Sequence, residues 1–455
     1  MNMKEKFILL SIILLFIIIS LNRSISSEEY PEMLLTENDR LLILAPHPDD
    51  EIVGCGGLIQ KAIKRKIPIH ILFLTYGDFN EWSFMIYRKR PVLSKESVLN
   101  MGEIRHKEAL SAAKVMGVGE ENLTFLGYPD FGTQEIWYRH WNTSKAYKSL
   151  LTRATEVPYK NALRPGSPYK GEEILKDIKT VLNEFKPTKI FVTHSGDNHP
   201  DHRAFYLFNS VALWDLHIKT EVYPYLVHYN KWPNPRKYEP DRTLTPPENL
   251  MEIVKWQNMS LSHDERDLKV RTLMEHKTQY EANKDYLLSF MRPNELWGDF
   301  PFIELNSNLT ENLGVYKEGE IPGELLDEEK AIFVDLEKLS VKIEDGKIEF
   351  SAHISRPIAE TVALSVYLFG YREGVDFSLM PKIHIKFGTL GYEIYDQNKK
   401  LSKNLLNIKR KPKDIVLSLS LSAIGNPERI FLSAETYIAD IPLDSSPWRI
   451  IIIKE

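Results

Sequence analysis

Short apolar segments alternate with amphipathic helical patterns between about residues 40 and 193, and this alternation constrains the fold more than any other feature. Four segments have the length and composition of buried strands: 41–45, 67–75, 123–126 and 189–193. Helical patterns lie between them: 56–65, 103–116 and 174–185. Strands that alternate with helices form right-handed crossovers and a mostly parallel sheet with helices on both faces. We therefore expect an α/β, Rossmann-like domain, although the sequence contains no GxGxxG motif.

The composition changes near residue 315. We expect the α/β domain to cover residues 38–315 and the acidic segment 316–332 to be a linker. Beyond the linker the apolar residues alternate with a period of two. Asp345-Gly346 separates two such runs, which is a strong signal for a hairpin with a type I′ turn. The many short strands predict an antiparallel β-sandwich over residues 333–455.

The first 27 residues form a separate unit. Two lysines precede the unbroken apolar run 7–21, and the small polar segment 22–27 follows it. This order is that of a secretory signal, and the run is shorter than the ~20 residues that normally span a bilayer. An uncleaved membrane anchor is the alternative for residues 1–27. Either would place the rest of the chain outside the cytoplasm, as an extracellular, periplasmic or membrane-anchored protein.

Composition excludes several kinds of site. The chain has 58 basic and 63 acidic residues and no basic block, so binding to nucleic acid has no electrostatic support. Cys55 is the only cysteine, which excludes an internal disulfide and a CxxC metal site. Any bound metal must therefore be held by histidines and carboxylates.

Two polar motifs directly follow predicted strands: PHPDDE at residues 46–51 and HSGDNHPDH at residues 194–202. Open α/β sheets bind ligands beyond the carboxyl ends of their strands. Buried carboxylates carry a high desolvation cost, and a divalent cation would supply the counter-charge. Each motif alone could instead be a helix start whose carboxylates bind backbone N–H groups. The occurrence of both motifs in one sheet favours a metal site.

The pair PHPDDE and HPDH resembles the PIG-L/LmbE-like deacetylases, zinc-dependent enzymes that hydrolyse N-acetyl groups on compounds containing N-acetylglucosamine. The resemblance extends over roughly residues 38–300. It includes the helix 103–118 with Arg105 and Glu108, and the segment LGYPD at 126–130. The same order of four short matches makes the resemblance specific.

The resemblance implies that His47, Asp50 and His202 are ligands of Zn²⁺, with another divalent ion such as Fe²⁺ as the alternative. Three protein ligands leave zinc a position for water, as in catalytic rather than structural sites. Asp49 would be the general base that takes the proton of this water.

The second motif supplies two further roles by resemblance. His199 would bind the developing oxyanion or protonate the amine leaving group. Asp201 would orient His199 and keep it cationic. An amide is a poor electrophile with a poor leaving group, so its hydrolysis needs a polarised carbonyl, an activated water and a proton for nitrogen.

Substrate contacts have structural alternatives. By resemblance, Arg105 would bind the sugar or an attached phosphate, and Asp130 a sugar hydroxyl. The alternatives are an ion pair between Arg105 and Glu108 within one helix, and a turn carboxylate at Asp130. The aromatic-rich stretch 132–171 breaks the alternation and is expected to be an insertion over one end of the sheet. Its residues Trp137 and Trp141 would stack on a sugar ring or, alternatively, pack the insertion down.

We therefore expect a metal-dependent hydrolase that removes an acetyl group from an N-acetylated amino sugar in a glycan, glycolipid or glycoconjugate. A zinc amidase that acts on a non-sugar amide is the first alternative. A non-catalytic extracellular carbohydrate-binding protein is the second. The C-terminal region could bind glycans, but its fold alone does not give a function.

Overall fold

The computed structural model describes residues 30–79, 94–306, 310–314, 333–358, 362–438 and 441–454. The expected signal or anchor at 1–27 and the expected linker at 316–332 lie outside the described residues. Within the described ranges, no helix has both the length and the apolar composition needed to cross a bilayer.

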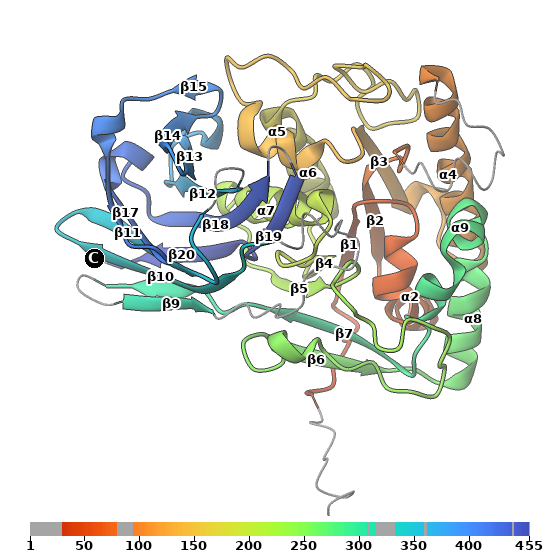
Figure 1. Cartoon of the computed structure of the whole chain (residues 1–455). Coiled ribbons are helices and arrows are strands. Elements are labelled where there is room, and N and C mark those ends of the chain that lie inside the picture. The colour runs from red at the N-terminus through yellow and green to blue at the C-terminus, as the bar shows by residue number, and fades with distance from the viewer. Residues whose placement is uncertain are drawn as a thin grey trace, which may run out of the picture.

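A five-stranded parallel sheet with the order β3-β2-β1-β4-β5 forms the centre of the α/β region (Figure 1). Its strands are β1 (Leu41–Ala45), β2 (Ile69–Thr75), β3 (Leu123–Tyr128), β4 (Lys189–Thr193) and β5 (Glu221–Tyr225). Every residue of β1 is buried because helices cover both faces of the sheet. The strand order reverses between β1 and β4, which is the topological switch point where such sheets bind ligands. The expected Rossmann-like sheet is confirmed.

Seven helices are described in this region: α2 (Asp50–Lys64), α4 (Lys95–Met116), α5 (Thr133–Arg139), α6 (Gly171–Phe185), α7 (Pro200–Asp215), α8 (His263–Leu273) and α9 (Lys277–Leu288). Figure 1 shows α6 and α7 on the side of the C-terminal strands, and α4, α8 and α9 on the opposite side. Ser94 caps α4 by accepting a hydrogen bond from the Ser97 amide, and Gly117 ends it with a φ of 80°. α9 is kinked at Asn283, whose φ of −143° and ψ of 41° are not helical. β6 (Lys255–Ser260) and β7 (Asn294–Asp299) form a separate antiparallel pair.

The C-terminal strands form two stacked sheets, which confirms the expected sandwich. One sheet contains β16 (Leu406–Arg410), β17 (Asp414–Ser420), β11 (Lys347–Ile354), β10 (Leu336–Glu344) and β9 (Thr310–Gly314) in spatial order. The other contains β15 (Lys399–Lys400), β14 (Gly391–Asp396), β13 (Lys382–Gly388), β12 (Val362–Tyr371), β18 (Arg429–Ile438), β20 (Arg449–Ile453) and β8 (Ile303–Leu305), with β19 (Ile441–Ser445) paired to β18. Asp345 and Gly346 have φ values of 50° and 67°, as the predicted type I′ turn requires.

The boundary between the regions differs from the expected one. β8 and β9 lie inside the range 38–315 expected for the α/β domain. However, β8 pairs with β20, and β9 pairs with β10. Strand pairing therefore places the start of the sandwich near Ile303 rather than at residue 333. The sequence did not assign β8 and β9 to the sandwich because both strands are short and both precede the acidic segment 316–332.

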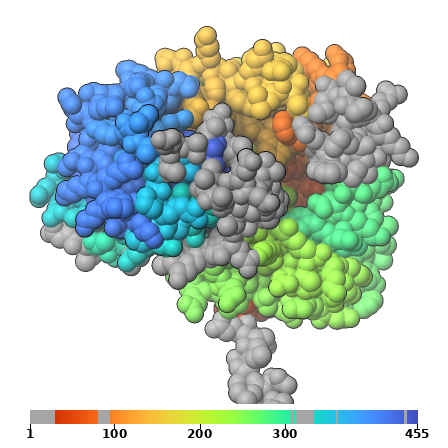
Figure 2. Space-filling model, in the orientation of Figure 1, coloured from red at the N-terminus to blue at the C-terminus, as the bar shows by residue number. Residues whose placement is uncertain are grey.

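An aromatic cluster joins the two regions along a contact that we call the seam. Trp137 of α5 lies with its ring centroid 5.2 Å from that of Phe377 and 5.3 Å from that of Phe431. Trp448, the residue before β20, donates its backbone N–H to the carbonyl oxygen of Ser195, 3.2 Å away. Figure 2 shows the blue C-terminal strands next to the gold segment that contains α5. The seam thus joins the sandwich directly to the loop that carries the second motif.

Candidate active site

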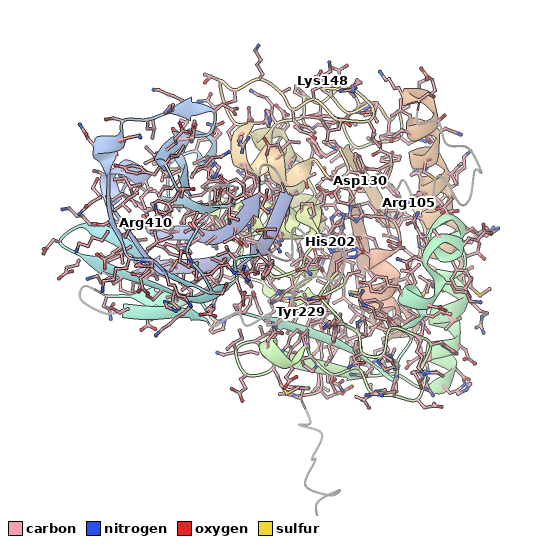
Figure 3. The ribbon with its side chains drawn as sticks, in the orientation of Figure 1. Arg105, Asp130, Lys148, His202, Tyr229 and Arg410 are labelled. Carbon is pink, nitrogen blue, oxygen red and sulfur yellow. The ribbon has the colours of Figure 1, made fainter. Side chains whose placement is uncertain are left out.

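Both motifs lie at the switch point of the parallel sheet. His47 follows β1, and Asp50 is the first residue of α2. His202 lies in the first turn of α7, just after β4, and is labelled near the centre of Figure 3. The three side chains are buried, with residue exposures of 6%, 2% and 0%. The fold thus brings together the three ligands expected from the sequence.

The potential ligand atoms of these residues form a nearly equilateral triangle. His47 Nδ1 lies 3.1 Å from Asp50 Oδ2, and His202 Nε2 lies 3.2 Å from the same oxygen. The third side, from His202 Nε2 to His47 Nδ1, is 3.3 Å. A tetrahedral zinc site with metal–ligand distances of about 2.0–2.1 Å separates its ligand atoms by about 3.3 Å. Two imidazoles and one carboxylate at this spacing fit a divalent ion of the zinc type.

A carboxylate faces the other ring nitrogen of each histidine. His47 Nε2 lies 3.1 Å from Asp130 Oδ1 and 3.3 Å from Asp201 Oδ2. His202 Nδ1 lies 3.3 Å from Asp197 Oδ2. Burial lowers the pKa of His47, but the facing carboxylates outweigh burial and raise it well above its usual value. Histidines that ligate metals usually have such a partner, which fixes the tautomer and the orientation of the ring.

Asp201 has a different role from the one expected. Its Oδ1 accepts hydrogen bonds from the Thr133 amide and hydroxyl at 3.0 and 2.5 Å, and its Oδ2 accepts one from the Phe131 amide at 2.6 Å. The carboxylate thus faces His47 and the start of α5, not His199. Only the backbone N–H of Asp201 reaches His199, by donating to Nδ1 at 3.2 Å. Among the described residues no hydrogen bond joins the Asp201 carboxylate to His199, so the expected orienting role is not supported by a direct contact.

His199 is the N-cap residue of α7 and is held as a neutral donor. Because its Nδ1 accepts a backbone hydrogen bond, the remaining proton lies on Nε2. Burial, together with the nearby His47, His202 and His228, lowers the pKa of His199 well below its usual value. Its ring centroid lies 4.6 Å from that of His47. The expected cationic state is not supported, but a neutral imidazole can still donate a hydrogen bond from Nε2.

Asp49 sits on a strained backbone. Its φ of 122° is rare for a residue with a Cβ, and its amide donates to Glu51 Oε2 at 2.8 Å. Glu51 in turn lies 2.9 Å from His276 Nε2 through its other oxygen. Burial raises the pKa of Asp49 to about 7, while Arg105 opposes this shift and Asp50 adds to it. A carboxyl with a pKa near neutrality has the proton affinity that a general base requires.

Arg105 reaches the site from α4. Its guanidinium donates to the carbonyl oxygens of Gly77 and Pro48, both at 2.7 Å, and lies 3.6 Å from Asp49 Oδ1. The alternative ion pair with Glu108 is wrong, because Glu108 accepts two hydrogen bonds from α9 instead. A Cβ on Gly77 would lie 2.1 Å from the Arg105 guanidinium, so only glycine permits this approach. Arg105 therefore supports the loop of Asp49, and its contact with a substrate stays a prediction.

A cavity of 320 Å³ opens at this cluster. Six of the residues expected in the site line it: His47, Asp49, Asp50, Arg105, Asp130 and His199. Five apolar side chains and four further polar or aromatic ones complete the wall: Val53, Phe79, Phe131, Val227 and Leu287, with His228, Gln279, Asn283 and Tyr286. This volume and this mixture of polar and apolar walls are typical of small-molecule sites. The Asp130 carboxylate also accepts a hydrogen bond from the Phe79 amide at 3.0 Å.

Trp137 and Trp141 do not line this cavity. Both have an exposure of 0%. Trp141 donates its indole N–H to the Trp137 carbonyl oxygen at 2.6 Å, and its ring lies 5.1 Å from that of Phe377 at the seam. The alternative of structural packing thus describes both residues, and the expected stacking platform is wrong.

Two residues of the site were not assigned a role from the sequence. Asp197 Oδ2 accepts hydrogen bonds from the amides of Val227 and His228 at 2.8 and 2.9 Å, so it joins the loops after β4 and β5. His228 follows β5, and its ring centroid lies 4.9 Å from that of His202. Burial and the neighbouring His202 lower the pKa of His228 to about 4. The apolar run that ends at His228 was the available signal for a fifth strand with a polar residue at its end.

Comparison with known proteins agrees with the resemblance. Residues 42–213 match the family model PIG-L, described as GlcNAc-PI de-N-acetylase. Over 175 residues the chain is 27% identical to 1D-myo-inositol 2-acetamido-2-deoxy-alpha-D-glucopyranoside deacetylase 1 of Saccharopolyspora erythraea, and the match covers 37% of this chain and 52% of that protein. The chain thus spans about half the length of this relative. The expected resemblance to the PIG-L deacetylases is confirmed for residues 42–213.

Two further similarities involve a second curated protein and a solved structure. The chain is 23% identical over 200 residues to the probable N-acetyl-alpha-D-glucosaminyl L-malate deacetylase 2 of Bacillus anthracis, which covers 42% of this chain and 77% of that protein. A structure of N,N'-diacetylchitobiose deacetylase from Pyrococcus horikoshii is 19% identical, with a TM-score of 0.32, and covers 55% of this chain and 75% of that chain.

Proposed function

We propose that the protein is a metal-dependent hydrolase that removes the acetyl group from an N-acetylglucosamine-type sugar, with Zn²⁺ as its ion. Residues 42–213, which match the PIG-L family model, would form its catalytic domain. One observation carries the proposal. The three ligand atoms of His47, Asp50 and His202 lie 3.1–3.3 Å apart, beside a cavity that Asp49 and His199 also line. This arrangement supplies metal ligands, a base and a hydrogen-bond donor within one site.

The chemistry follows from these groups. Bound Zn²⁺ would lower the pKa of water and polarise the acetamide carbonyl. Asp49 accepts a proton as the water oxygen bonds to the carbonyl carbon, and His199 Nε2–H donates a hydrogen bond to the carbonyl oxygen. The C–N bond then breaks, and the proton passes from Asp49 to the departing nitrogen. The products are acetic acid and the free amine, which exchange one proton in water to give acetate and the protonated amino sugar, so atoms and charge balance.

The substrate class is supported by two observations. The apolar part of the cavity wall, with Val53 and Phe131, suits the methyl group of an acetamide. The two curated relatives are named as deacetylases of compounds that contain an N-acetylated glucosamine unit. Arg105 and Asp130 also line the cavity and are the proposed contacts for sugar hydroxyls.

Export, proposed from the apolar run 7–21, would give the enzyme access to glycans, glycolipids or glycoconjugates outside the cytoplasm. Antibodies or a reporter fused to the C-terminus would test this proposal by protease protection in intact cells. Recovery of the protein in the cytoplasmic fraction would contradict it.

Acetate release tests the enzymatic proposal. The purified protein is incubated with N-acetylglucosamine oligomers and N-acetylated glycolipids, with added Zn²⁺ and after chelation. Release that chelation abolishes, that Zn²⁺ restores and that Asp49→Ala eliminates would support the proposal. Stoichiometric Zn²⁺ binding without release from any sugar would favour a non-sugar amide as substrate. Failure to bind a metal would contradict the whole assignment.

A further inference from the structure

A second cavity, of 690 Å³, adjoins the first, and residues of both the α/β region and the sandwich line it. The two cavities share His228, Asn283 and Tyr286 in their linings, so they meet at these residues. Residues 442–445, which belong to β19 of the sandwich, form part of the wall of the second cavity. In Figure 3, Arg105 and Asp130 lie on one side of His202, and Tyr229 of the second cavity lies on the other. The candidate site therefore extends well beyond the metal ligands.

The wall of the second cavity carries free hydrogen-bonding groups. Four of its polar side chains have no hydrogen bond or ion pair within the described part of the chain: Asn198, Asn230, Asn283 and Asp285. Amides and a carboxylate offer both donors and acceptors, which is what sugar hydroxyls require. The first cavity differs, because apolar side chains form much of its wall.

The junction between the cavities is held in place by the fold. The hydroxyl of Tyr286 donates to the Val227 carbonyl oxygen at 2.6 Å, and the Arg236 guanidinium lies 5.1 Å from the centre of its ring. The kink in α9 at Asn283 brings this amide to both cavities. These contacts fix the junction before any ligand binds, which lowers the entropy cost of binding.

Arg203 fixes the sandwich wall relative to the metal ligands. Its Nε donates to the Asp197 carbonyl oxygen, and its terminal nitrogen donates to Ser445 Oγ at 2.9 Å. Asp197 also contacts His202, so a short chain of contacts runs from β19 to the candidate metal centre. The guanidinium of Arg236, similarly, donates to the backbone carbonyl oxygens of Trp232 and Tyr229. Both arginines are thus engaged by the protein, and the groups left for a ligand are mainly neutral amides.

We propose that the second cavity binds the sugar units adjoining the acetamido sugar, so that the substrate is an oligosaccharide rather than a monosaccharide. This inference rests on the proposed deacetylase function. The second cavity has roughly twice the volume of the first, which gives room for about two further sugar units if the first holds one. The sandwich then takes part in substrate binding through β19.

Chain length is the variable to test. Acetate release by the purified full chain is measured with N-acetylglucosamine and its dimer, trimer and tetramer. We expect kcat/KM to rise at least about 10-fold from monomer to trimer and then to level off. The reason is that contacts with the non-reacting sugar units also stabilise the transition state of amide hydrolysis. Equal kcat/KM values for all lengths would overturn the inference while leaving the deacetylase function intact.

A matched pair of variants locates the effect. Asn230 lines the second cavity but not the first. Asn230→Ala is expected to reduce the trimer-to-monomer ratio of kcat/KM at least about 5-fold, since lost hydrogen bonds affect only the longer substrate. Asn183→Ala, at an exposed position of α6, is the control and should leave the ratio at the wild-type value. An unchanged ratio in Asn230→Ala would overturn the assignment of this cavity.

Direct binding separates the inference from the proposed function. Calorimetric titration of the Asp49→Asn variant with the N-acetylglucosamine trimer needs no turnover. Binding of the trimer that Asn230→Ala weakens would support the second cavity even if no acetate were released from any substrate. Absence of trimer binding would overturn the inference, whatever the activity towards the monomer.

Discussion

Buried polar groups are arranged differently in the α/β region and in the sandwich. At the end of the parallel sheet, buried ionisable side chains face one another: His47 lies within 3.3 Å of Asp50, Asp130 and Asp201. In the sandwich, two buried ionisable groups have neutral partners instead. Lys382 donates to the backbone carbonyl oxygens of Phe377 and Met380, and His384 lies 2.8 Å from Ser365 Oγ. The space between the sandwich sheets is otherwise filled by apolar side chains.

The comparison shows that the α/β region retains buried charged groups that do not favour folding. Buried charges that face other charges are costly to desolvate, and apolar side chains of similar size would often be at least as stable. Such clusters are therefore characteristic of functional sites. The sandwich core follows the ordinary rule that a buried polar group is satisfied by a hydrogen bond. The four predictions below test this contrast.

The largest effect is expected at Asp50, a proposed metal ligand. Asp50→Asn preserves the shape of the side chain but removes the charge that faces His47 and His202. We expect kcat/KM to fall by at least roughly 10³-fold, because the metal supplies several kcal/mol of transition-state stabilisation. Asp414→Asn, at an exposed position of β17, makes the same change in the sandwich and should alter kcat/KM less than about 2-fold. Comparable losses in both variants would remove the distinction between the regions.

The next effect concerns the seam. Trp137 is fully buried, and its ring contacts both α7 and the sandwich. Trp137→Ala should lower the free energy of unfolding by about 3–5 kcal/mol. Denaturant unfolding followed by fluorescence and circular dichroism measures this change. Leu379→Ala, whose side chain is 63% exposed close to the seam, should change it by less than about 0.5 kcal/mol. A sandwich transition that does not move in Trp137→Ala would show that the two regions unfold independently.

A smaller effect is expected at Asp197, which contacts the proposed ligand His202. Asp197→Asn keeps the side-chain size but weakens the contact with His202 Nδ1. Affinity for Zn²⁺ should fall by about 10–100-fold, as is usual when the partner of a ligating histidine is changed. Competition with a chromogenic chelator would measure this. Asp396→Asn in β14 serves as the sandwich control. A Zn²⁺ affinity equal to that of the wild type in Asp197→Asn would contradict the role given to Asp197.

The smallest effect is a pH dependence that originates in the sandwich. Burial lowers the pKa of His384 from 6.5 to about 3. The unfolded chain therefore takes up this proton first, and stability falls as the pH decreases from 6.5 towards 3. Between pH 7 and pH 5 this group should account for a loss of about 2 kcal/mol. His384→Gln should remove that part of the loss, as measured by denaturant titration at both pH values. An identical loss of stability in His384→Gln would contradict the lowered pKa of His384.

Much of this architecture was predictable from local patterns. The four expected strands correspond to β1–β4, since buried strands of a parallel sheet are continuous apolar runs. The common location of His47, Asp50 and His202 was predictable because their two motifs each begin directly after such a strand, whereas their role as metal ligands was implied by the family resemblance and stays a prediction. The hairpin at Asp345 was predictable because only a few residue pairs favour its turn.

The remainder depended on contacts between distant segments. Trp137 packs against Phe377 and Phe431 of the sandwich instead of stacking on a sugar. Both partners lie more than two hundred positions further along the chain. The Asp201 carboxylate contacts His47 and the start of α5 because α5 folds against α7. No local pattern contains such information, so the roles of these residues could be assigned only from the structure.

The contacts of the sandwich with Ser195 and with Arg203 have a consequence for exchanging parts between related proteins. Trp448 binds the backbone of Ser195, and Arg203 binds Ser445. A chimera that takes its C-terminal region from a relative would therefore inherit a different wall beside its catalytic loop. Such a graft preserves the seam only if the partners of Trp137 and Arg203 are matched as well, so the two regions would have to be exchanged together.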